Sequence, residues 1–544
     1  MEAIEHFEVP HLALWKSCAA EMLAGETKQT RTTAYGIDTG HPLMKATDIY
    51  CRAMERNAPL KDPGKDSTDE LAVQAYLSFL HHKMAHAKIG NDAAKEVSLQ
   101  KEIAEYKFGN PLWQQMFVQY YKYYWQYPYH QGAVPKYRSW QADDAGKGSL
   151  DYGVIEWKLP ANARIIIVGD IGTGTEEAAN VLSAACKFKP DAILHLGDIY
   201  FSGTRRETRH RLVDMVRRVL KKENCRAPFF TVPGNHEYFT GAVSLLDALD
   251  SGKLIYKPDQ AQQASYFCLR SEDDGWQFLG LDTGYNGHYM NVAKGAQKAV
   301  LEHLHIGEIS KPDGASDPHW SKHFNPYFLN PAEADLPQKD TTSPVAMVTV
   351  RPDELIWHQD KLKNFTGRAV LLSHHQLYSA LDVCGVAQAF LPGTETPDPK
   401  DPNRLWVNTG LWQQFGSFFG DRVGAWIWGH EHNLVIFEDN YRPADWSSDD
   451  EFMQIYKNLP KGRCAGHSAI PVQDTEEPYK VNYPVPLKEA DLTLSLTKVE
   501  EQNWYNHGFQ LIELAGKGNP ARLSYFQVSL NDDVPLPLFV ESII

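Results

Sequence analysis

The chain has 544 residues, of which 43% are hydrophobic and 23% are charged, so it can bury a sizeable core, and its length exceeds what one core usually organises. Its formal net charge of −15 at pH 7 argues against general nucleic-acid binding and against binding to anionic membranes, because both depend on cationic side chains. No apolar run approaches the roughly 20 residues of a membrane helix, and the first residues lack the features of a secretory signal, so we expect a cytoplasmic protein without membrane association.

Residues 1–140 are predicted to form a helical N-terminal region without strands. Ser67–Glu70 matches a capping box, which predicts a helix start. The apolar residues behind it recur at helical spacing and are Val73, Leu77, Leu80 and Met84. A second helix is expected from Trp113 to Trp125, because its apolar face is wide and Pro128 follows.

Residues 141–150 are polar and contain glycine, which indicates a linker, and residues 151–544 are predicted to form a second unit. Short β-branched runs alternate there with helical patterns, which predicts an α/β fold with a sheet covered on both faces. The expected strands are Arg164–Val168, Ala192–Leu196, Phe229–Val232, Ala369–Leu372 and Ala425–Trp428. Two later runs, Phe509–Leu514 and Leu523–Val528, are expected to close a second sheet. Irregular stretches near 287–352 and 439–490 are predicted insertions.

Polar residues gather where several of these apolar runs end. The segments concerned are Gly169–Gly172, Gly197–Asp198, Gly234–Glu237, Ser373–His375 and Gly429–His432. Each supplies a carboxylate, an amide or an imidazole at an expected strand end, so the side chains should meet along one rim of a sheet. Hard oxygen donors combined with imidazoles are what a two-metal hydrolytic centre needs. The pattern therefore predicts a metal cluster.

In this order the segments resemble those of the calcineurin-like metallophosphoesterases, a superfamily that includes the purple acid phosphatases. The resemblance covers roughly Arg164 to Phe437 and the C-terminal strands. It implies a four-layer α-β-β-α sandwich for residues 151–544, with the helical region as an addition. It also implies an enzyme that uses two divalent metal ions to hydrolyse a phosphomonoester or phosphodiester by a metal-bound hydroxide. The expected substrate is a phosphorylated small molecule or a nucleotide.

The resemblance also implies a role for each residue of the predicted site. Asp170 and His432 would bind the first metal, and Asp198 would bridge both metals. The second metal would be completed by Asn235, His374 and His430. His236 would be catalytic and not a ligand, because it would stabilise the phosphoryl group or protonate the leaving oxygen.

Two positions depart from the family pattern. Most members have a histidine two residues after the first aspartate, where this chain has Gly172. Purple acid phosphatases also have glycine there and compensate with a tyrosine three residues after the bridging aspartate, but that position is Phe201. The chain is thus nearest in motif style to those enzymes but lacks their tyrosine ligand. We expect water or the adjacent Tyr200 to fill the gap, although Tyr200 should point elsewhere unless its turn is rebuilt. Mn, Fe or Zn are the expected metals.

Four further residues are candidates on weaker grounds. Arg205 and Arg206 follow the bridging-aspartate segment and are possible substrate contacts, although a solvated helix face is the simpler interpretation. His375 could replace His374 as a ligand, but the strand phase favours His374. His467 is more simply explained as a structural histidine than as a catalytic one.

Two competing interpretations start from the same residues. A non-catalytic module of this fold could bind a partner through the helical N-terminal region, and the missing first-metal ligand supports this alternative. Gly169, Gly172 and Gly174 form a glycine-rich turn, but their spacing differs from that of the dinucleotide-binding fingerprint. We therefore expect no nucleotide cofactor.

Overall fold

The computed structural model describes most of the chain. The described residues are 6–7, 9–26, 40–56, 58, 60–89, 91–123, 137–141, 148–254, 257–287, 348–379, 406–420, 422–437, 459–473, 494, 496–499, 502–529 and 534–543. Most of the two predicted insertions and most of the predicted linker lie outside these ranges. None of the described helices is both long enough and apolar enough to cross a bilayer. The predicted cytoplasmic location stays a prediction.

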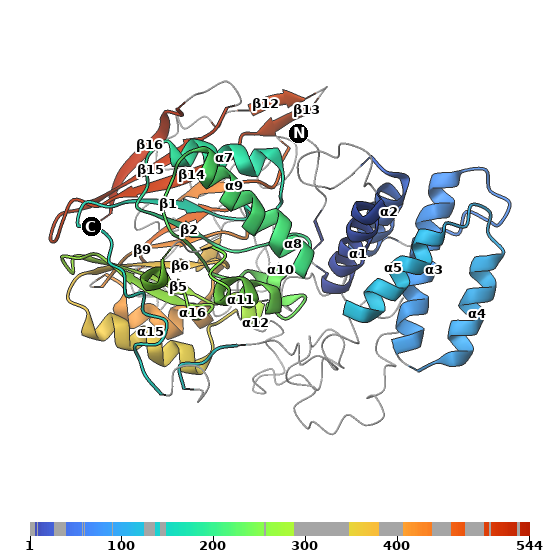
Figure 1. The fold of residues 1–544 in the computed structure, drawn as a ribbon, viewed down its shortest axis with the longest axis horizontal. Helices are drawn as coiled ribbons and strands as arrows, with labels where there is room; N and C mark the ends of the chain where they lie inside the picture. The colour runs from blue at the N-terminus through green and yellow to red at the C-terminus, as the bar shows by residue number, and fades with distance from the viewer. Residues whose placement is uncertain are drawn as a thin grey trace, which may run out of the picture.

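The N-terminal region is a set of helices beside the rest of the molecule (Figure 1). The helices are α1 (Pro10–Glu26), α2 (Pro42–Glu55), α3 (Glu70–Ile89), α4 (Ala93–Ala104) and α5 (Pro111–Tyr121). No strand occurs among the described residues before Trp140. The predicted helix start is therefore confirmed at α3, but its capping residue differs. Asp69 accepts a hydrogen bond from the amide of Ala72 at 3.0 Å, whereas the hydroxyl of Ser67 accepts one from the amide of Asp69.

The first sheet has six strands in the order β16-β15-β14-β1-β2-β3. Strands β1 (Arg164–Val168), β2 (Ala192–His195) and β3 (Phe229–Thr231) are parallel. The C-terminal strands are β14 (Gly508–Glu513), β15 (Ala521–Gln527) and β16 (Pro537–Ile543). We expected C-terminal strands to close a second sheet, and this was wrong, because β14 pairs antiparallel with β1. The buried pattern of β1 fits a central strand but does not specify which strand occupies each edge.

The second sheet also has six strands, in the order β10-β11-β9-β6-β5-β4. Its strands are β4 (Phe267–Arg270), β5 (Trp276–Leu281), β6 (Arg368–Ser373), β9 (Val423–Trp428), β10 (Leu434–Ile436) and β11 (Lys461–Ala465). Strands β5, β6 and β9 are parallel neighbours. Two small pairs complete the described strands, namely β7 (Tyr378–Ser379) with β8 (Trp406–Val407) and β12 (Leu496–Val499) with β13 (Gln502–Tyr505).

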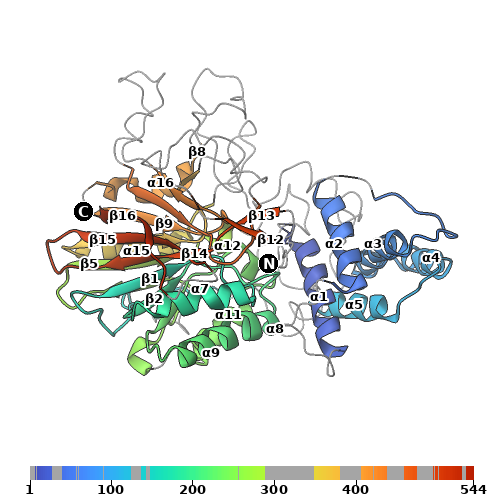
Figure 2. The same cartoon turned by 90° about the horizontal axis from the view of Figure 1, so that it is seen from above.

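The two sheets pack face to face and helices cover both outer faces. In β1, Ile165 and Ile167 face the second sheet, while Ile166 and Val168 belong to the cluster under the outer helices. Figure 2 shows α7 (Glu176–Cys186), α9 (Asp214–Lys222) and α11 (Val243–Asp250) on one side of the sheets. The opposite face is covered by α15 (Pro352–Asn364) and α16 (Thr409–Phe415). The predicted four-layer α-β-β-α sandwich with an added helical region is confirmed.

The core of the helical region continues into the sandwich. Buried residues of α1, α2, α3 and α5 form one apolar cluster that also includes Tyr200, Phe201, Phe239 and Ile470. Thr204 donates a hydrogen bond of 2.9 Å to Glu21 of α1. The helical region therefore packs directly against the loop that follows β2.

Candidate metal centre

The candidate residues lie in the loops at the carboxyl ends of β1, β2, β6 and β9. Asp170 follows β1 by two residues and Asp198 follows β2 by three. Both have left-handed backbone conformations, with φ of 58° and 72°, and His430 has φ of 65°. Non-glycine residues seldom adopt this conformation and are held there by surrounding structure, often at functional sites. The three turns lie at the same end of the sandwich, where the amide of His430 donates to Oδ2 of Asp170.

The first part of the centre is arranged around the hydroxyl of Tyr200. This oxygen lies 3.0 Å from Oδ1 of Asp170 and 3.0 Å from Oδ2 of Asp198. It also lies 2.7 Å from Nε2 of His432. Tyr200, Asp170 and Asp198 are almost fully buried, and the side chain of His432 is 11% exposed. Tyr200 thus faces the cluster, as the rebuilt-turn alternative requires.

Loop geometry explains why Tyr200 faces inward. We assumed that strand alternation continued to Tyr200, but β2 ends at His195. Gly197 and Asp198 follow with φ of 96° and 72°, so the chain turns before it reaches Tyr200. Phe201 points into the apolar cluster of the helical region, where Nζ of Lys16 lies 4.5 Å from the centre of its ring. Tyr200 therefore faces the cluster and Phe201 faces the helical region, which is the reverse of what a regular strand would give.

The acceptor atoms of this first group outnumber the protons that the phenol can donate to them. A phenol carries one proton and can donate only one hydrogen bond, yet Tyr200 faces two carboxylate oxygens and one ring nitrogen. Such a convergence of oxygen and imidazole donors is the environment in which a divalent cation is stable. The residues present therefore fit a metal ion.

The second part of the centre is arranged around Nε2 of His374. This nitrogen lies 3.0 Å from Oδ1 of Asn235, 3.3 Å from Oδ2 of Asp198 and 3.1 Å from Nδ1 of His430. On the other side of the ring, Nδ1 donates a hydrogen bond of 2.8 Å to the carbonyl of Leu196. A neutral His374 therefore directs the lone pair of Nε2 into the cluster, which is the tautomer that a metal ligand requires.

The charges around His374 and Asp198 are strongly coupled. Burial by itself lowers the pKa of His374, but the carboxylate of Asp198 raises it more, to about 9. Burial would raise the pKa of Asp198, yet His374 and His236 hold it well below its usual value. In the absence of a metal, a proton on His374 balances the carboxylate. A divalent ion would displace that proton, because ligands bind metal in their deprotonated form.

A third imidazole lies beside His374 and His430. Ligand atoms of His374, His375 and His430 lie within 4.8 Å of one another, as do those of Asp170, Asp198 and His374. The ring of His375 is 4.6 Å from that of His430, and its Nδ1 is 3.1 Å from the hydroxyl of Thr283. Nε2 of His430 is buried and has no hydrogen-bond partner among the described residues. His374 and His375 thus both lie at the centre, although the sequence reasoning treated them as alternatives.

His236 lies against the first group from the side of α10 (Asn235–Tyr238). Its Nδ1 is 2.5 Å from the carbonyl of Phe201, and because a carbonyl only accepts, Nδ1 carries the proton. Its Nε2 lies 3.8 Å from Oδ2 of Asp198, and its ring is 4.6 Å from that of Tyr200. Burial lowers the pKa of His236, while the carboxylate of Asp198 opposes this effect. The carbonyl of Phe201 therefore directs Nε2 toward the cluster.

Glycines make room for these side chains. A Cβ on Gly172 would lie 2.3 Å from the carbonyl oxygen of Asp198 and 2.7 Å from the Cα of Ile199. No histidine could occupy this position without moving that loop, which explains why the first group lacks the usual ligand there. A Cβ on Gly234 would lie 2.0 Å from Oδ1 of Asp198, and one on Gly429 would lie 2.7 Å from Oδ2 of Asp170.

The two candidate substrate arginines are not joined to the cluster by any described contact. Arg205 and Arg206 are exposed on α8 (Arg205–Glu207), and Arg205 lies 3.7 Å from Asp247. Their role in substrate binding stays a prediction. Arg211, which we did not single out, is buried and donates to the carbonyl of Tyr200 and, at 3.2 Å, to Glu207. It helps to hold the loop that carries the phenol.

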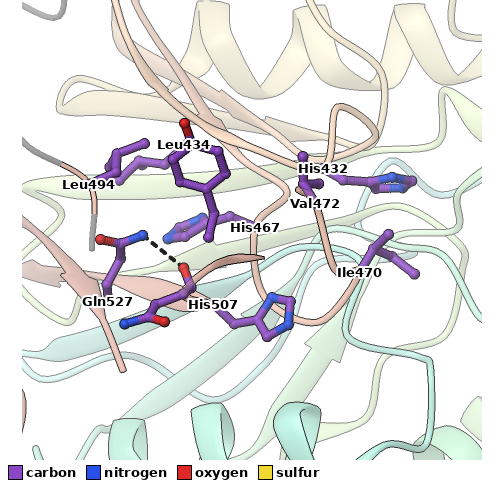
Figure 3. A pocket seen from close by; sticks show the side chains of 10 residues that line it. His432, Leu434, His467, Ile470, Val472, Leu494, His507 and Gln527 are labelled. Atoms are coloured by element: carbon purple, nitrogen blue, oxygen red, sulfur yellow. Dashed lines mark hydrogen bonds between the residues drawn. The ribbon is translucent and has the colours of Figure 1, made fainter. Parts of the chain in front are cut away.

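His432 also lines a small cavity (Figure 3). Its wall includes His467, Ile470, Val472 and His507 (Figure 3). His467 contacts the carbonyl of Phe526 at 3.3 Å, and burial lowers its pKa to about 4. These contacts agree with a structural role, and no described contact joins His467 to the cluster.

Comparisons with known proteins identify the family. The model for the calcineurin-like phosphoesterases matches residues 163–434, which is half of the 544 residues. No curated protein matches the chain. Among solved structures, the chain is similar to "GAP50 the anchor in the inner membrane complex of Plasmodium", with 12% identity over 70% of this chain and 88% of that chain and a TM-score of 0.34. That likeness is too weak to carry an argument, and the closer resemblance to purple acid phosphatases stays a prediction. The family match spans all five segments that supply candidate ligands, and the chain belongs to the calcineurin-like phosphoesterase family.

Proposed function

We propose that this protein hydrolyses phosphoesters at the centre described above with the help of two divalent metal ions. The observation that carries the proposal is the convergence of two buried donor groups on a shared carboxylate, Asp198. The residues that would hold the metals are Asp170, Tyr200 and His432 on one side, Asn235, His374 and His430 on the other, and Asp198 between them. Mn, Fe or Zn suits this mixture of oxygen and imidazole ligands.

When bound, the two ions supply Lewis-acid activation of water and neutralise charge on the phosphoryl oxygens. The chain's own residues prepare the site for this chemistry. The carbonyl of Leu196 fixes the tautomer of His374, and the amide of His430 donates a hydrogen bond of 2.9 Å to Oδ2 of Asp170. These contacts orient the donors before any substrate arrives, so little reorganisation is needed during the reaction.

His236 is proposed to act on the substrate through Nε2. Its Nδ1 proton is bound by the carbonyl of Phe201, so only Nε2 can exchange a proton with a leaving oxygen. Burial lowers the pKa of His236 and the carboxylate of Asp198 opposes this effect. When Nε2 carries a proton, it can donate to a phosphoryl or leaving-group oxygen. Phosphomonoesters, phosphodiesters and nucleotides share this reacting group, and all are included in the proposal.

The experiment that tests the function combines metal analysis with turnover. Purified protein would be analysed for bound metal and then assayed with an aryl phosphate and the matching diester in the presence of Mn, Zn or Fe(II). Asp198→Asn is the control, because it keeps the shape of the shared ligand but removes its charge. We expect metal and hydrolysis in the wild type and a loss of both in the control. A wild type without metal and without turnover under every ion would favour the non-catalytic alternative.

A further inference from the structure

The N-terminal arm, which we define as His6, Phe7 and Val9 before α1, reaches the metal centre. The ring of His6 is centred 4.5 Å from the ring of His432, with the two planes at 83°. It is also 5.9 Å from the ring of Tyr200. His6 is close enough to interact electrostatically with His236 and Asp198 as well. A residue near the start of the chain therefore lies beside the first donor group.

The arm is anchored immediately after His6. Phe7 and Val9 are 1% and 0% exposed and belong to the apolar cluster of the helical region. The amide of Val9 donates to Glu55 at 3.4 Å. Nζ of Lys16 lies 5.0 Å from the ring centre of Phe7 and 4.5 Å from that of Phe201. These contacts hold the arm against the helices and against the loop after β2.

The helical region is itself attached to the loop that carries the phenol. Glu21 of α1 accepts hydrogen bonds from Thr204 at 2.9 Å and from Tyr123 at 2.8 Å. Tyr200 and Phe201 belong to the same apolar cluster as Phe7. The position of His6 relative to His432 is therefore determined by packing on both sides.

His6 lies at the more exposed edge of the first donor group. Asp170, Asp198 and His374 are 0–1% exposed, whereas His6 is only partly buried, as is its neighbour His432. The groups of described residues whose ligand atoms lie within 4.8 Å of one another include neither of these two histidines. Its imidazole lies beside the rings of His432 and Tyr200, so a phosphoryl group bound at the first donor group would lie next to it.

We propose that His6 is a substrate-binding residue that donates a hydrogen bond to a phosphoryl oxygen of the phosphoester. This proposal rests on the proposed function, because it concerns the substrate of the same centre. An imidazole carries at least one N–H whatever its protonation state, so the donor does not depend on titration. In a chain with a net charge of −15, binding of an anion depends on such local donors. The helical region thereby contributes to the active site.

The test uses full-length protein loaded with Mn and compares His6→Ala, His6→Gln and the wild type. His210→Ala is the matched control, because His210 is exposed on the segment after α8, where it contacts Asp214. Binding of inorganic phosphate would be measured by calorimetry, bound metal by elemental analysis, and KM and kcat with an aryl phosphate. For His6→Ala we expect phosphate binding to weaken and KM to rise, each about tenfold, as for loss of one hydrogen bond to a charged group. The metal content should be unchanged. His6→Gln should recover part of the loss.

Three other outcomes for His6→Ala overturn the assignment. Unchanged phosphate binding in His6→Ala would mean that His6 does not touch the substrate. Loss of metal in this variant would indicate a ligand or a structural role, and a gain in turnover would indicate that the arm obstructs the site. A wild type that binds metal and phosphate without turnover would contradict the proposed function but not the His6 contact. A wild type that binds neither would overturn both.

Discussion

The hydroxyl of Tyr200 lies 2.7 Å from Nε2 of His432, although 232 positions separate the two residues along the chain. The loop after β2 and the loop after β9 meet through this contact. Asp170 and Asp198 approach the same hydroxyl at 3.0 Å each. The phenol therefore adds a donor to the group that lacks the family's usual ligands, because this chain has Gly172 and Phe201 at the positions that carry them. This leads to the first prediction.

Tyr200→Phe should weaken binding at the first donor group and leave the second group intact. The substitution removes one oxygen from a group that otherwise contains Asp170, Asp198 and His432. We expect the metal content to fall from two ions toward one, as measured by elemental analysis after dialysis. If iron is bound, a visible absorption band from the phenolate should also disappear. Tyr76→Phe in α3 is the control, and equal metal content in both variants would contradict the assignment.

His236→Ala should reduce turnover while metal binding persists. The imidazole contacts the carbonyl of Phe201 through Nδ1, and the proposal gives Nε2 the task of proton transfer. General acid–base catalysis usually contributes about 10²–10⁴-fold, so kcat should fall by this factor. The measurement is kcat with an aryl phosphate together with metal analysis. Loss of metal in parallel with activity would show that His236 is a ligand.

Gly172→Ala should destabilise the protein and disturb the centre. The added Cβ would lie 2.3 Å from the carbonyl of Asp198, which is backbone and cannot rotate away. Overpacking of this kind typically costs up to about 3 kcal/mol. Thermal unfolding and metal content would be measured against Gly109→Ala, since a Cβ on Gly109 has no atom within 4 Å. A Gly172→Ala protein as stable as this control would contradict the packing argument.

Glu541→Gln should destabilise the sandwich far more than Glu513→Gln does. Glu541 of the first sheet receives two hydrogen bonds of 2.6 Å from Arg463 of the second sheet, and this arginine is fully buried. Without the carboxylate, a buried charge loses its partner, which costs about 3–5 kcal/mol. Glu513 pairs with a half-exposed Arg522 at 3.5 Å, so its loss should cost no more than about 1 kcal/mol.

The pair of Arg463 and Glu541 also makes the free energy of unfolding depend on pH. Burial would raise the pKa of Glu541, but Arg463 lowers it below the usual value of 4.5. The stabilisation is therefore present above pH 4.5 and is lost as the pH falls through the lower, folded pKa. Urea unfolding of the wild type and Glu541→Gln at pH 7 measures the free-energy difference, and equal stability of the two proteins would contradict the prediction.

His11→Leu should reduce the acid sensitivity of the helical region. His11 is fully buried near His82 and His86, and burial lowers its pKa from 6.5 to about 3. The folded protein keeps this ring neutral, whereas the unfolded chain takes up a proton below about pH 6.5. The stabilisation is thus complete above pH 6.5 and falls by about 1.4 kcal/mol per pH unit below it.

The measurement for His11 is the difference in unfolding free energy between pH 7.5 and pH 5.5. We expect this difference to be smaller by about 1.4 kcal/mol in His11→Leu than in the wild type. His210→Gln is the control, because its side chain is 48% exposed. An unchanged difference in His11→Leu would mean that the ring is protonated in the folded state.

The sequence predicts the sandwich and the meeting of the donors for one physical reason. Parallel strands with buried faces have a recognisable pattern, and residues after their carboxyl ends must share one rim. Asp170 and Asp198 follow β1 and β2 of the first sheet, so the pattern alone brings them to the same edge. His374 follows β6 of the second sheet and reaches them because the two sheets pack against each other. The helical character of the region before Trp140 follows from periodicity and is equally local.

Features that depend on long-range packing could not be predicted from local sequence patterns. The inward direction of Tyr200 depends on the left-handed turn at Gly197 and Asp198, which strand alternation does not describe. The pairing of β14 with β1 depends on which sheet edge is open. The contact of His6 with His432 joins residues that are far apart in the sequence, and no local pattern at position 6 indicates it.

The shared apolar cluster of α1–α5 with the loop after β2 limits how the chain can be divided. The sequence places a boundary near residues 141–150, yet Phe201, Phe239 and Ile470 lie in the cluster of the helical region. A fragment that begins at residue 151 would expose these side chains to water, and surfaces of this kind promote self-association. Substitutions in α1 are therefore expected to influence activity. The helical region and the sandwich should therefore be produced and purified as one unit.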